Sequence, residues 1–264
     1  MVFPKGNDAR TGRFGPRRRV LARLLLAGAV LGAVLGAVLA GLLLVVPDMS
    51  DPPRPADRPL APLSGAGPLR LVAFGTSLSA STPWPAHLEA RLTACLGRPA
   101  AMARVARSGA GSAWAETQLD RVAALAPDIV LMEFAINDAD ILDGVSVAAS
   151  RARHAAILEA LETALPETRV LLLTMNPVTG MLRHLQRPRL PAYYRMVRDL
   201  ARERDLALAD LAPRWRAAFA ADPALVPADG LHPAAAATDQ VVVPVLAAAI
   251  GQAAGAGACQ TPPP

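Results

Sequence analysis

The chain of 264 residues lacks both common glycine-rich phosphate-binding patterns, GxGxxG and GxxxxGK, and it contains no internal repeat. The first absence argues against a phosphate-binding loop. Three clustered acids, Asp138, Asp140 and Asp143, lack the Asp-x-Asp-x-Asn-Gly spacing of a calcium loop. We therefore expect a solvated acidic loop there, and neither a metal nor another cofactor is required.

Excess positive charge is also absent beyond residue 23. The first 23 residues have a net charge of +6 and the whole chain has +5, so the remainder is close to neutral. The basic pI therefore belongs to a tail and does not indicate binding to nucleic acid. The basic residues of this tail are Lys5, Arg10, Arg13, Arg17, Arg18, Arg19 and Arg23.

A long run without charge follows, from Leu24 to Val46. Its roughly 23 residues suit a hydrocarbon core of ~30 Å, which predicts a transmembrane signal anchor. The basic residues before it place 1–23 in the cytoplasm and the rest of the chain in the periplasm or outside the cell. The alternative is a cleaved signal peptide, because Val38-Leu39-Ala40 resembles a cleavage site.

The remaining chain divides by composition into three parts. Residues 47–68 are rich in proline and show no apolar periodicity, which predicts an extended linker that buries no core. Residues 69–251 form one domain large enough to bury a substantial core. Residues 252–264 are expected to be a frayed tail that contains one cysteine.

Apolar runs alternate with helical patterns through this domain, which predicts an α/β fold with a parallel, doubly wound sheet covered on both faces. The predicted strands are Leu69–Phe74, Ala101–Val105, Ile129–Phe134, Val170–Thr174 and Leu206–Ala209. The predicted helices are Pro85–Leu96, Ala113–Leu125, Val147–Leu165, Leu190–Arg204, Pro213–Ala221 and Ala234–Ile250.

A serine stands directly after the first predicted strand, where Gly75 ends the apolar run and Thr76-Ser77 follow. Ligands of open α/β sheets bind beyond the carboxyl ends of the strands, so Ser77 is a candidate nucleophile. Taken alone, the stretch better fits a serine that caps a turn.

Asp229-Gly230-Leu231-His232 supplies the complementary chemistry. A carboxylate three residues before a histidine can fix the imidazole tautomer, leaving the other ring nitrogen to take a proton from a serine. Asn137 follows the third predicted strand, and its amide can donate to an oxyanion. Gly109 and Gly111 precede a predicted helix and allow a close approach to backbone N–H groups.

Other polar residues receive structural interpretations. Glu133, inside an apolar strand, is expected to pair with an arginine. His87 and His154 are expected on helix surfaces, and His184 in a loop.

In the order Gly75-Thr76-Ser77-Leu78, Gly111, Asn137-Asp138 and Asp229-x-x-His232, the chain resembles the GDSL or SGNH hydrolases. The resemblance implies a flavodoxin-like five-stranded sheet, with Ser77 as nucleophile, His232 as general base and Asp229 as its orienting acid. It also implies an oxyanion hole formed by the N–H groups of Ser77 and Gly111 and the side chain of Asn137.

Three positions depart from the family pattern. Thr76 replaces the usual Asp, Ala106 stands where Asn is frequent, and Ala135 replaces the usual Gly. None of these departures removes a reacting group. Gly109 remains an alternative to Gly111 as the backbone donor of the oxyanion hole.

The resulting expectation is a serine esterase anchored in the inner membrane, acting on a small-molecule or polysaccharide ester such as an O-acetyl group of an envelope polysaccharide. Alternatives are acyl transfer to a sugar, hydrolysis of a lysophospholipid or small ester, and a non-catalytic envelope-assembly module. The sequence does not indicate an oligomeric state.

Substrate contacts are predicted at Thr76 and in the loop 181–189, where Arg187 or Arg189 would hold an anionic substrate. A solvated loop is the alternative. In the strand order implied by the resemblance, the first and last helices cover one face, so Cys95 and Cys259 can form a disulfide in an oxidising compartment. Two unrelated thiols are the alternative.

Overall fold

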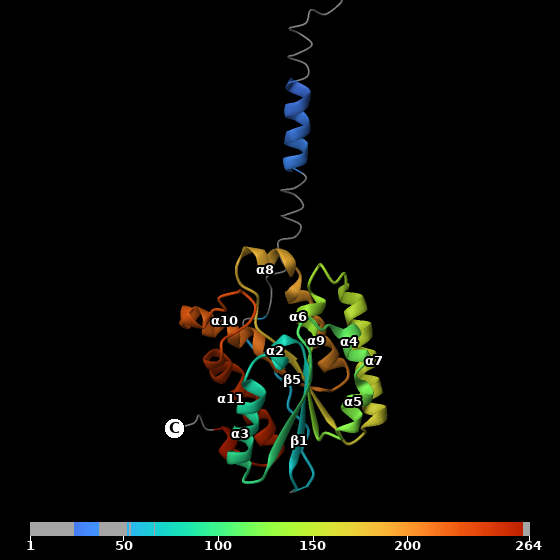
Figure 1. Cartoon of the computed structure of the whole chain (residues 1–264), viewed down its shortest axis with the longest axis vertical. Helices are drawn as coiled ribbons and strands as arrows, with labels where there is room; N and C mark the ends of the chain where they lie inside the picture. Colours follow the sequence, from blue (N-terminus) through green and yellow to red (C-terminus); the bar gives the residue numbers. More distant parts are fainter. Residues whose placement is uncertain (1–23, 37–51, 53, 66, 261–264) are drawn as a thin grey trace, which may run out of the picture. The chain divides into compact units, whose positions relative to one another are not determined.

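The computed structural model describes residues 24–36, 52, 54–65 and 67–260. The chain divides into two units, 1–46 and 47–264. In the first unit, an apolar helix spans Leu24–Gly36 (Figure 1). It is shorter than a membrane span requires. The basic tail 1–23 and the rest of the predicted span, 37–46, lie outside the described residues.

The second unit is built on five parallel strands in the order β2-β1-β3-β4-β5, as the flavodoxin-like prediction requires. The strands are β1 (Leu69–Gly75), β2 (Ala100–Ala106), β3 (Ile129–Glu133), β4 (Arg169–Thr174) and β5 (Ala207–Asp210). In register, Gly75 lies opposite both Ala106 and Glu133. The last residues of the three adjoining strands therefore meet at one edge of the sheet.

Helices cover both faces of the sheet (Figure 1). One side carries α3 (Trp84–Leu96), α10 (Leu211–Ala221) and α11 (Ala235–Ala253), and the other carries α4 (Ser112–Glu116), α5 (Leu119–Ala124), α7 (Val147–Ala164) and α9 (Leu190–Glu203). Among the described helices, α11 alone has the length and hydropathy of a membrane span, but half of its most apolar window is buried. It packs against α3 and is therefore a core helix.

Several short elements were not predicted as the structure has them. The single helix expected at 113–125 is broken into α4 and α5, where the Thr117 hydroxyl bonds back to the Trp114 carbonyl and competes with the helical ladder. The unpredicted helices are α2 (Ser77–Ala80), α6 (Ala135–Asp138), α8 (Met181–Gln186) and the 3₁₀ turns Pro223–Leu225 and Gly257–Gln260.

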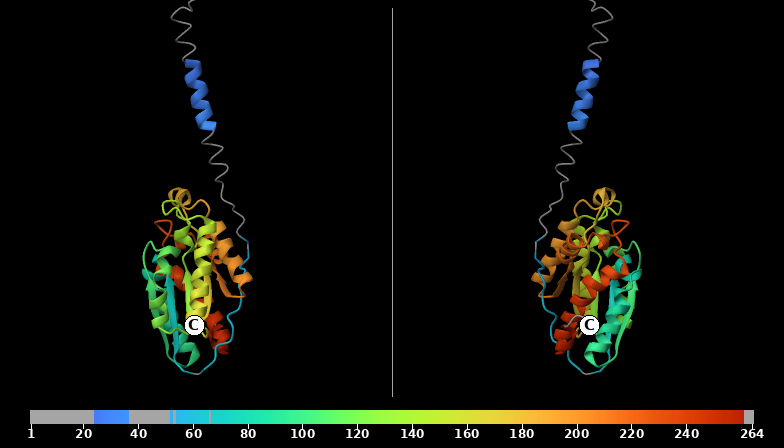
Figure 2. Two further views of the ribbon diagram at one scale, coloured as in Figure 1. Left: turned by 90° about the vertical axis from the view of Figure 1, so that its right-hand side faces the viewer. Right: turned by 90° about the vertical axis from the view of Figure 1, so that its left-hand side faces the viewer.

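The proline-rich segment is not a free spacer where it is described. Residues 54–65, here called the strap, run along the domain (Figure 2). Arg58 forms an antiparallel bridge with Leu208, Leu63 N–H donates to the Ala253 carbonyl at 2.9 Å, and Leu60 is buried in the core. The expectation that this segment buries no core was wrong. The segment has no apolar periodicity, but backbone hydrogen bonds to β5 and α11 hold it against the domain, and Leu60 is buried there.

The tail expected to fray is ordered through residue 260. Helix α11 continues to Ala253, and the following 3₁₀ turn carries Cys259, which is fully buried. A disulfide joins Cys259 to Cys95 of α3, with a Cα–Cα distance of 5.0 Å. This is the pairing that the sequence led us to expect. Gly251 permits it, because a Cβ there would collide with the Cys259 side chain.

Candidate active site

The turn after β1 presents Ser77 as the first residue of α2. Thr76 is the N-cap: its Oγ1 accepts from the Leu78 N–H at 3.1 Å. This bond satisfies a backbone donor that the helix start leaves open. The Ser77 side chain consequently stands at the carboxyl edge of the sheet, on a helix N-terminus that favours negative charge.

Glu133, the last residue of β3, holds this turn from the neighbouring strand. Its Oε1 accepts from the Thr76 N–H at 2.6 Å and from the Ser79 hydroxyl at 2.8 Å. Gly75 must lack a side chain, because a Cβ there would lie only 2.1 Å from Oε1. The arginine partner predicted for Glu133 was wrong, since hydroxyl and backbone donors satisfy the carboxyl group instead. Burial raises the pKa of Glu133 from 4.5 to about 7, although the hydrogen bonds oppose the shift.

His232 reaches Ser77 from the loop before α11. Ser77 Oγ lies 2.9 Å from His232 Nε2, and His232 Nδ1 lies 2.6 Å from Asp229 Oδ2. Asp229 Oδ1 also accepts the backbone N–H groups of Leu231 and His232. Burial would raise the pKa of Asp229, but hydrogen bonds from the His232 backbone and ring and from Leu231 hold it well below its ordinary value. Asp229 is therefore ionised and can orient an imidazolium.

A close packing contact sets the conformation of this histidine loop. Gly230 has φ +75°, and a Cβ there would strike the Thr179 carbonyl. The Thr179 N–H donates to the Gly230 carbonyl at 2.9 Å, and Arg183 Nε donates to the Asp229 carbonyl at 3.0 Å. Segment 179–183 thus holds the acid and the histidine in place.

Two further loops meet beside Ser77. Asn137 Nδ2 donates to the Ala110 carbonyl at 2.9 Å, which places the amide next to Gly111. Asp138 Oδ1 accepts the Ser112 N–H at 2.8 Å and leaves no room for a Cβ at Gly111. Gly109 has φ +73° and no close neighbour, so it serves the turn. The geometry therefore favours Gly111 over Gly109 as the residue next to Asn137.

A buried polar network lies next to these loops, and it was not predicted from the sequence. The Ser150 hydroxyl donates to Asp138 Oδ2 at 2.6 Å, and His154 Nδ1 lies 3.8 Å from the same oxygen. The surface position expected for His154 was wrong, because its side chain is 2% exposed. Burial lowers the pKa of His154, although Asp138 opposes the shift, so this histidine is neutral at pH 7. Ser150 and His154 lie four residues apart in α7, a spacing that places both on one face.

The structure contradicts two of the three predicted substrate contacts. Thr76 is fully buried against Glu133, so the prediction that it contacts substrate was wrong. Arg187 is also buried: it pairs with Asp140 at 2.8 Å and donates from Nε to the Ile136 carbonyl at 2.9 Å. Its predicted hold on an anionic substrate was wrong too, because the residue is only 6% exposed: Nε and Nη2 contact internal acceptors, and Nη1 is buried without a hydrogen-bond partner among the described residues. Arg189 is exposed, and its role stays a prediction.

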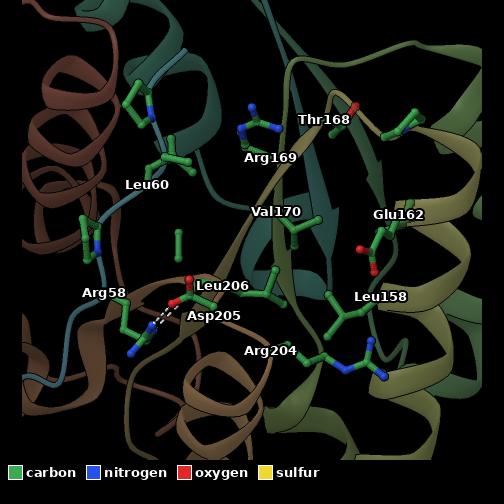
Figure 3. A pocket seen from close by; sticks show the side chains of 16 residues that line it. Arg58, Leu60, Leu158, Glu162, Thr168, Arg169, Val170, Arg204, Asp205 and Leu206 are labelled. Atoms are coloured by element: carbon green, nitrogen blue, oxygen red, sulfur yellow. Dashed lines mark hydrogen bonds and ion pairs between the residues drawn. The ribbon is translucent and has the colours of Figure 1, made fainter.

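Among the described residues, no group of three or more His, Cys, Asp or Glu is arranged to hold a metal ion. A cavity of about 710 Å³ lies between the strap and the strand starts Arg169 and Ala207, lined also by Leu158 and Asp205 (Figure 3). It occupies the amino edge of the sheet, whereas Ser77 and His232 lie at the carboxyl edge. This cavity is therefore separate from the candidate active site.

These features define a class of protein: a flavodoxin-like α/β domain with a serine, a histidine and a carboxylate in one hydrogen-bonded chain. That arrangement can activate a hydroxyl for attack on a carbonyl carbon.

Comparison with known proteins identifies the family. The model of the GDSL-like lipase/acylhydrolase family matches residues 71–239. The chain belongs to this family, and it is a hydrolase that acts on ester bonds. No curated protein sequence matches it significantly.

Solved structures share the fold at low sequence identity. An acetylxylan esterase from Geobacillus stearothermophilus is 18% identical, with a TM-score of 0.59 over 72% of this chain and 95% of that one. A lipase/acylhydrolase from Enterococcus faecalis is 20% identical, with a TM-score of 0.57 over 67% and 93%. A GDSL-like lipase from Parabacteroides merdae is 17% identical, with a TM-score of 0.60 over 74% and 99%.

Proposed function

We propose that the protein is a serine esterase in which Ser77, His232 and Asp229 form the catalytic triad. The observation that carries this proposal is the hydrogen-bonded chain from Ser77 Oγ through the imidazole to Asp229. The low pKa of Asp229 supports it, because an ionised carboxylate stabilises the imidazolium that forms during the reaction.

In the proposed reaction, Ser77 Oγ attacks the ester carbonyl carbon while His232 Nε2 takes the hydroxyl proton. The N–H groups of Ser77 and Gly111 and the Asn137 amide hold the oxyanion. Collapse of the tetrahedral intermediate breaks the bond between the acyl carbon and the alcohol oxygen, and the alcohol leaves with the proton from His232. Water then attacks the acyl-enzyme, again with His232 as base, and releases the acid and Ser77. Losing one oxyanion donor typically costs ~3 kcal/mol of barrier.

The proposed substrate is an O-acetyl ester of an envelope or exported polysaccharide. A fold neighbour described as an acetylxylan esterase supports this class, although at 18% identity it shows the fold alone. We also propose that the apolar segment 24–46 anchors the chain in the inner membrane, with the catalytic domain in the periplasm. The Cys95–Cys259 disulfide supports an exported domain, because such bonds persist in oxidising compartments.

The test compares wild type and Ser77→Ala on acetylated glycans and p-nitrophenyl esters, with and without an acceptor sugar. We expect free acetate from wild type only, and labelling of wild type alone by a serine-directed phosphonate. Unchanged thermal unfolding of the variant is the control for folding. Full activity in Ser77→Ala would overturn the assignment, and an acylated acceptor sugar would identify a transferase.

A further inference from the structure

Large apolar side chains are exposed together beside the candidate active site. Between residues 67 and 260, all the large hydrophobics that the structure describes as exposed belong to this cluster except Leu125 and Val226, which are 39% and 36% exposed. We call the cluster the α8 rim. Its members are Ile141 at 59%, Leu142 at 76%, Met181 at 80%, Leu182 at 67% and Leu185 at 48% exposure.

The two parts of the α8 rim are joined to one another and to the site. The Ile141 N–H donates to the Gln186 carbonyl at 2.8 Å, which fixes the loop against α8. From the same helix, Arg183 donates to the Asp229 carbonyl. Figure 1 shows α8 at the end of the domain, beyond α2 and α6. The α8 rim therefore borders the edge at which Ser77 is presented.

Contiguous exposed apolar residues on a soluble domain mark a surface that meets a protein or a membrane. Here the neighbouring charges favour a membrane. His184 and Arg189 stand among the rim residues together with Arg183, which lies 3.8 Å from Asp229 Oδ2, while Asp140 pairs with Arg187 and Asp143 is the exposed acid. Apolar side chains with basic neighbours are typical of segments that lie in the headgroup region of an anionic bilayer.

The course of the strap gives an independent reason. The Ala56 N–H donates to Oδ2 of Asp210, the last residue of β5, at 3.0 Å. The strap therefore reaches the domain at the carboxyl edge, the edge that carries the α8 rim. About ten residues separate Ala56 from the end of the uncharged run at Val46, and such a chain spans at most about 35 Å.

From these observations we propose that the α8 rim docks on an anionic phospholipid bilayer, so that the active site works on esters carried by membrane-borne amphiphiles. The docking itself does not depend on the chemistry of Ser77. Its consequence for the substrate rests on the proposed function.

The first test measures contact in the full chain, reconstituted in vesicles of phosphatidylcholine and phosphatidylglycerol. Both native cysteines are in the disulfide, so Leu182→Cys provides a single thiol that is labelled with an environment-sensitive fluorophore without reductant. The matched control is Glu167→Cys, an exposed position in the turn between α7 and β4 at the amino edge. We expect a blue shift and quenching by doxyl-labelled lipid at position 182 but not at 167.

Equal quenching at the two positions would overturn the proposal. So would a label at 182 that is shielded from water but not quenched by doxyl lipid, because that result indicates a second copy or another protein on the α8 rim.

The second test compares hydrolysis of a long-chain ester dispersed in the vesicles with hydrolysis of p-nitrophenyl acetate. In Leu182→Ser/Leu185→Ser, the ratio of the first rate to the second should fall on the order of tenfold. The control, Leu125→Ser, removes an exposed leucine side chain outside the α8 rim and should leave the ratio unchanged. An unchanged ratio in the double variant would contradict docking. Absence of both activities in the wild type would contradict the proposed function, and the fluorescence result would still stand.

Discussion

The backbone N–H of Thr76 donates to Oε1 of Glu133 at 2.6 Å, so a carboxyl group on the central strand β3 fixes the residue before Ser77. The Thr76 N–H group that Glu133 accepts carries no charge, and burial raises the pKa of Glu133 to about 7. The position of the candidate nucleophile is thereby coupled to a group that titrates near neutral pH.

This coupling predicts a pH-dependent stability. Between pH 4.5 and 7 the folded state binds the Glu133 proton more tightly than the unfolded state, so the free energy of unfolding falls as pH rises through this window. The contribution is fully present below pH 4.5 and reaches at most about 3 kcal/mol. Glu133→Gln mimics the neutral form and should remove this slope. Urea unfolding of both proteins from pH 4.5 to 8 measures it, and parallel profiles would show that Glu133 does not titrate in this range.

A second prediction concerns Arg187, which holds the Ile136 carbonyl and Asp140 together next to Asn137. Arg187→Lys keeps the positive charge but replaces the planar fork, whose Nε and Nη2 reach the two acceptors separately, by a single ammonium nitrogen. We expect kcat to fall on the order of tenfold for neutral and acidic esters alike, because the oxyanion amide loses its support. The variant Arg121→Lys, at an exposed position in α5, is the matched control. A change in KM for acidic esters alone would show that Arg187 contacts the substrate.

The disulfide predicts a large effect on stability. Cys95 and Cys259 are 164 residues apart, and closing so long a loop stabilises by up to about 5 kcal/mol in the chain-entropy model. Cys95→Ser/Cys259→Ser should therefore lower the urea midpoint while leaving the fold intact. Mass spectrometry after alkylation without reductant checks the bond in exported protein. Two alkylated cysteines would mean that the bridge does not form there.

A further prediction concerns topology and the strap. Protease added to spheroplasts should release the catalytic domain, and the new N-terminus should lie between Pro47 and Ala56. Cleavage within 56–63 is disfavoured, because backbone hydrogen bonds tie Arg58 to β5 and Leu63 to α11. Mature protein that begins at Gly41 would instead identify the apolar run as a cleaved signal peptide.

The sequence by itself determined the α/β class and the five strands, because buried parallel strands appear as short apolar runs between helical patterns. It also indicated Ser77, Asn137, Asp229 and His232, through the family resemblance that their motifs carry when they are taken together in chain order. Parallel strands bring their carboxyl ends to one edge, so the proximity of these residues followed from the topology.

Only the tertiary structure decided the partners of buried polar groups. Nothing local distinguishes Arg187 on a solvated loop from Arg187 between Asp140 and Ile136, or assigns Glu133 to Thr76 and Ser79. The strap shows the same limit, because its hydrogen bonds to β5 and α11 join residues about 150 or more positions apart. Local pattern fixes which backbone conformation a segment favours, whereas contacts of this range form only when the whole chain has packed.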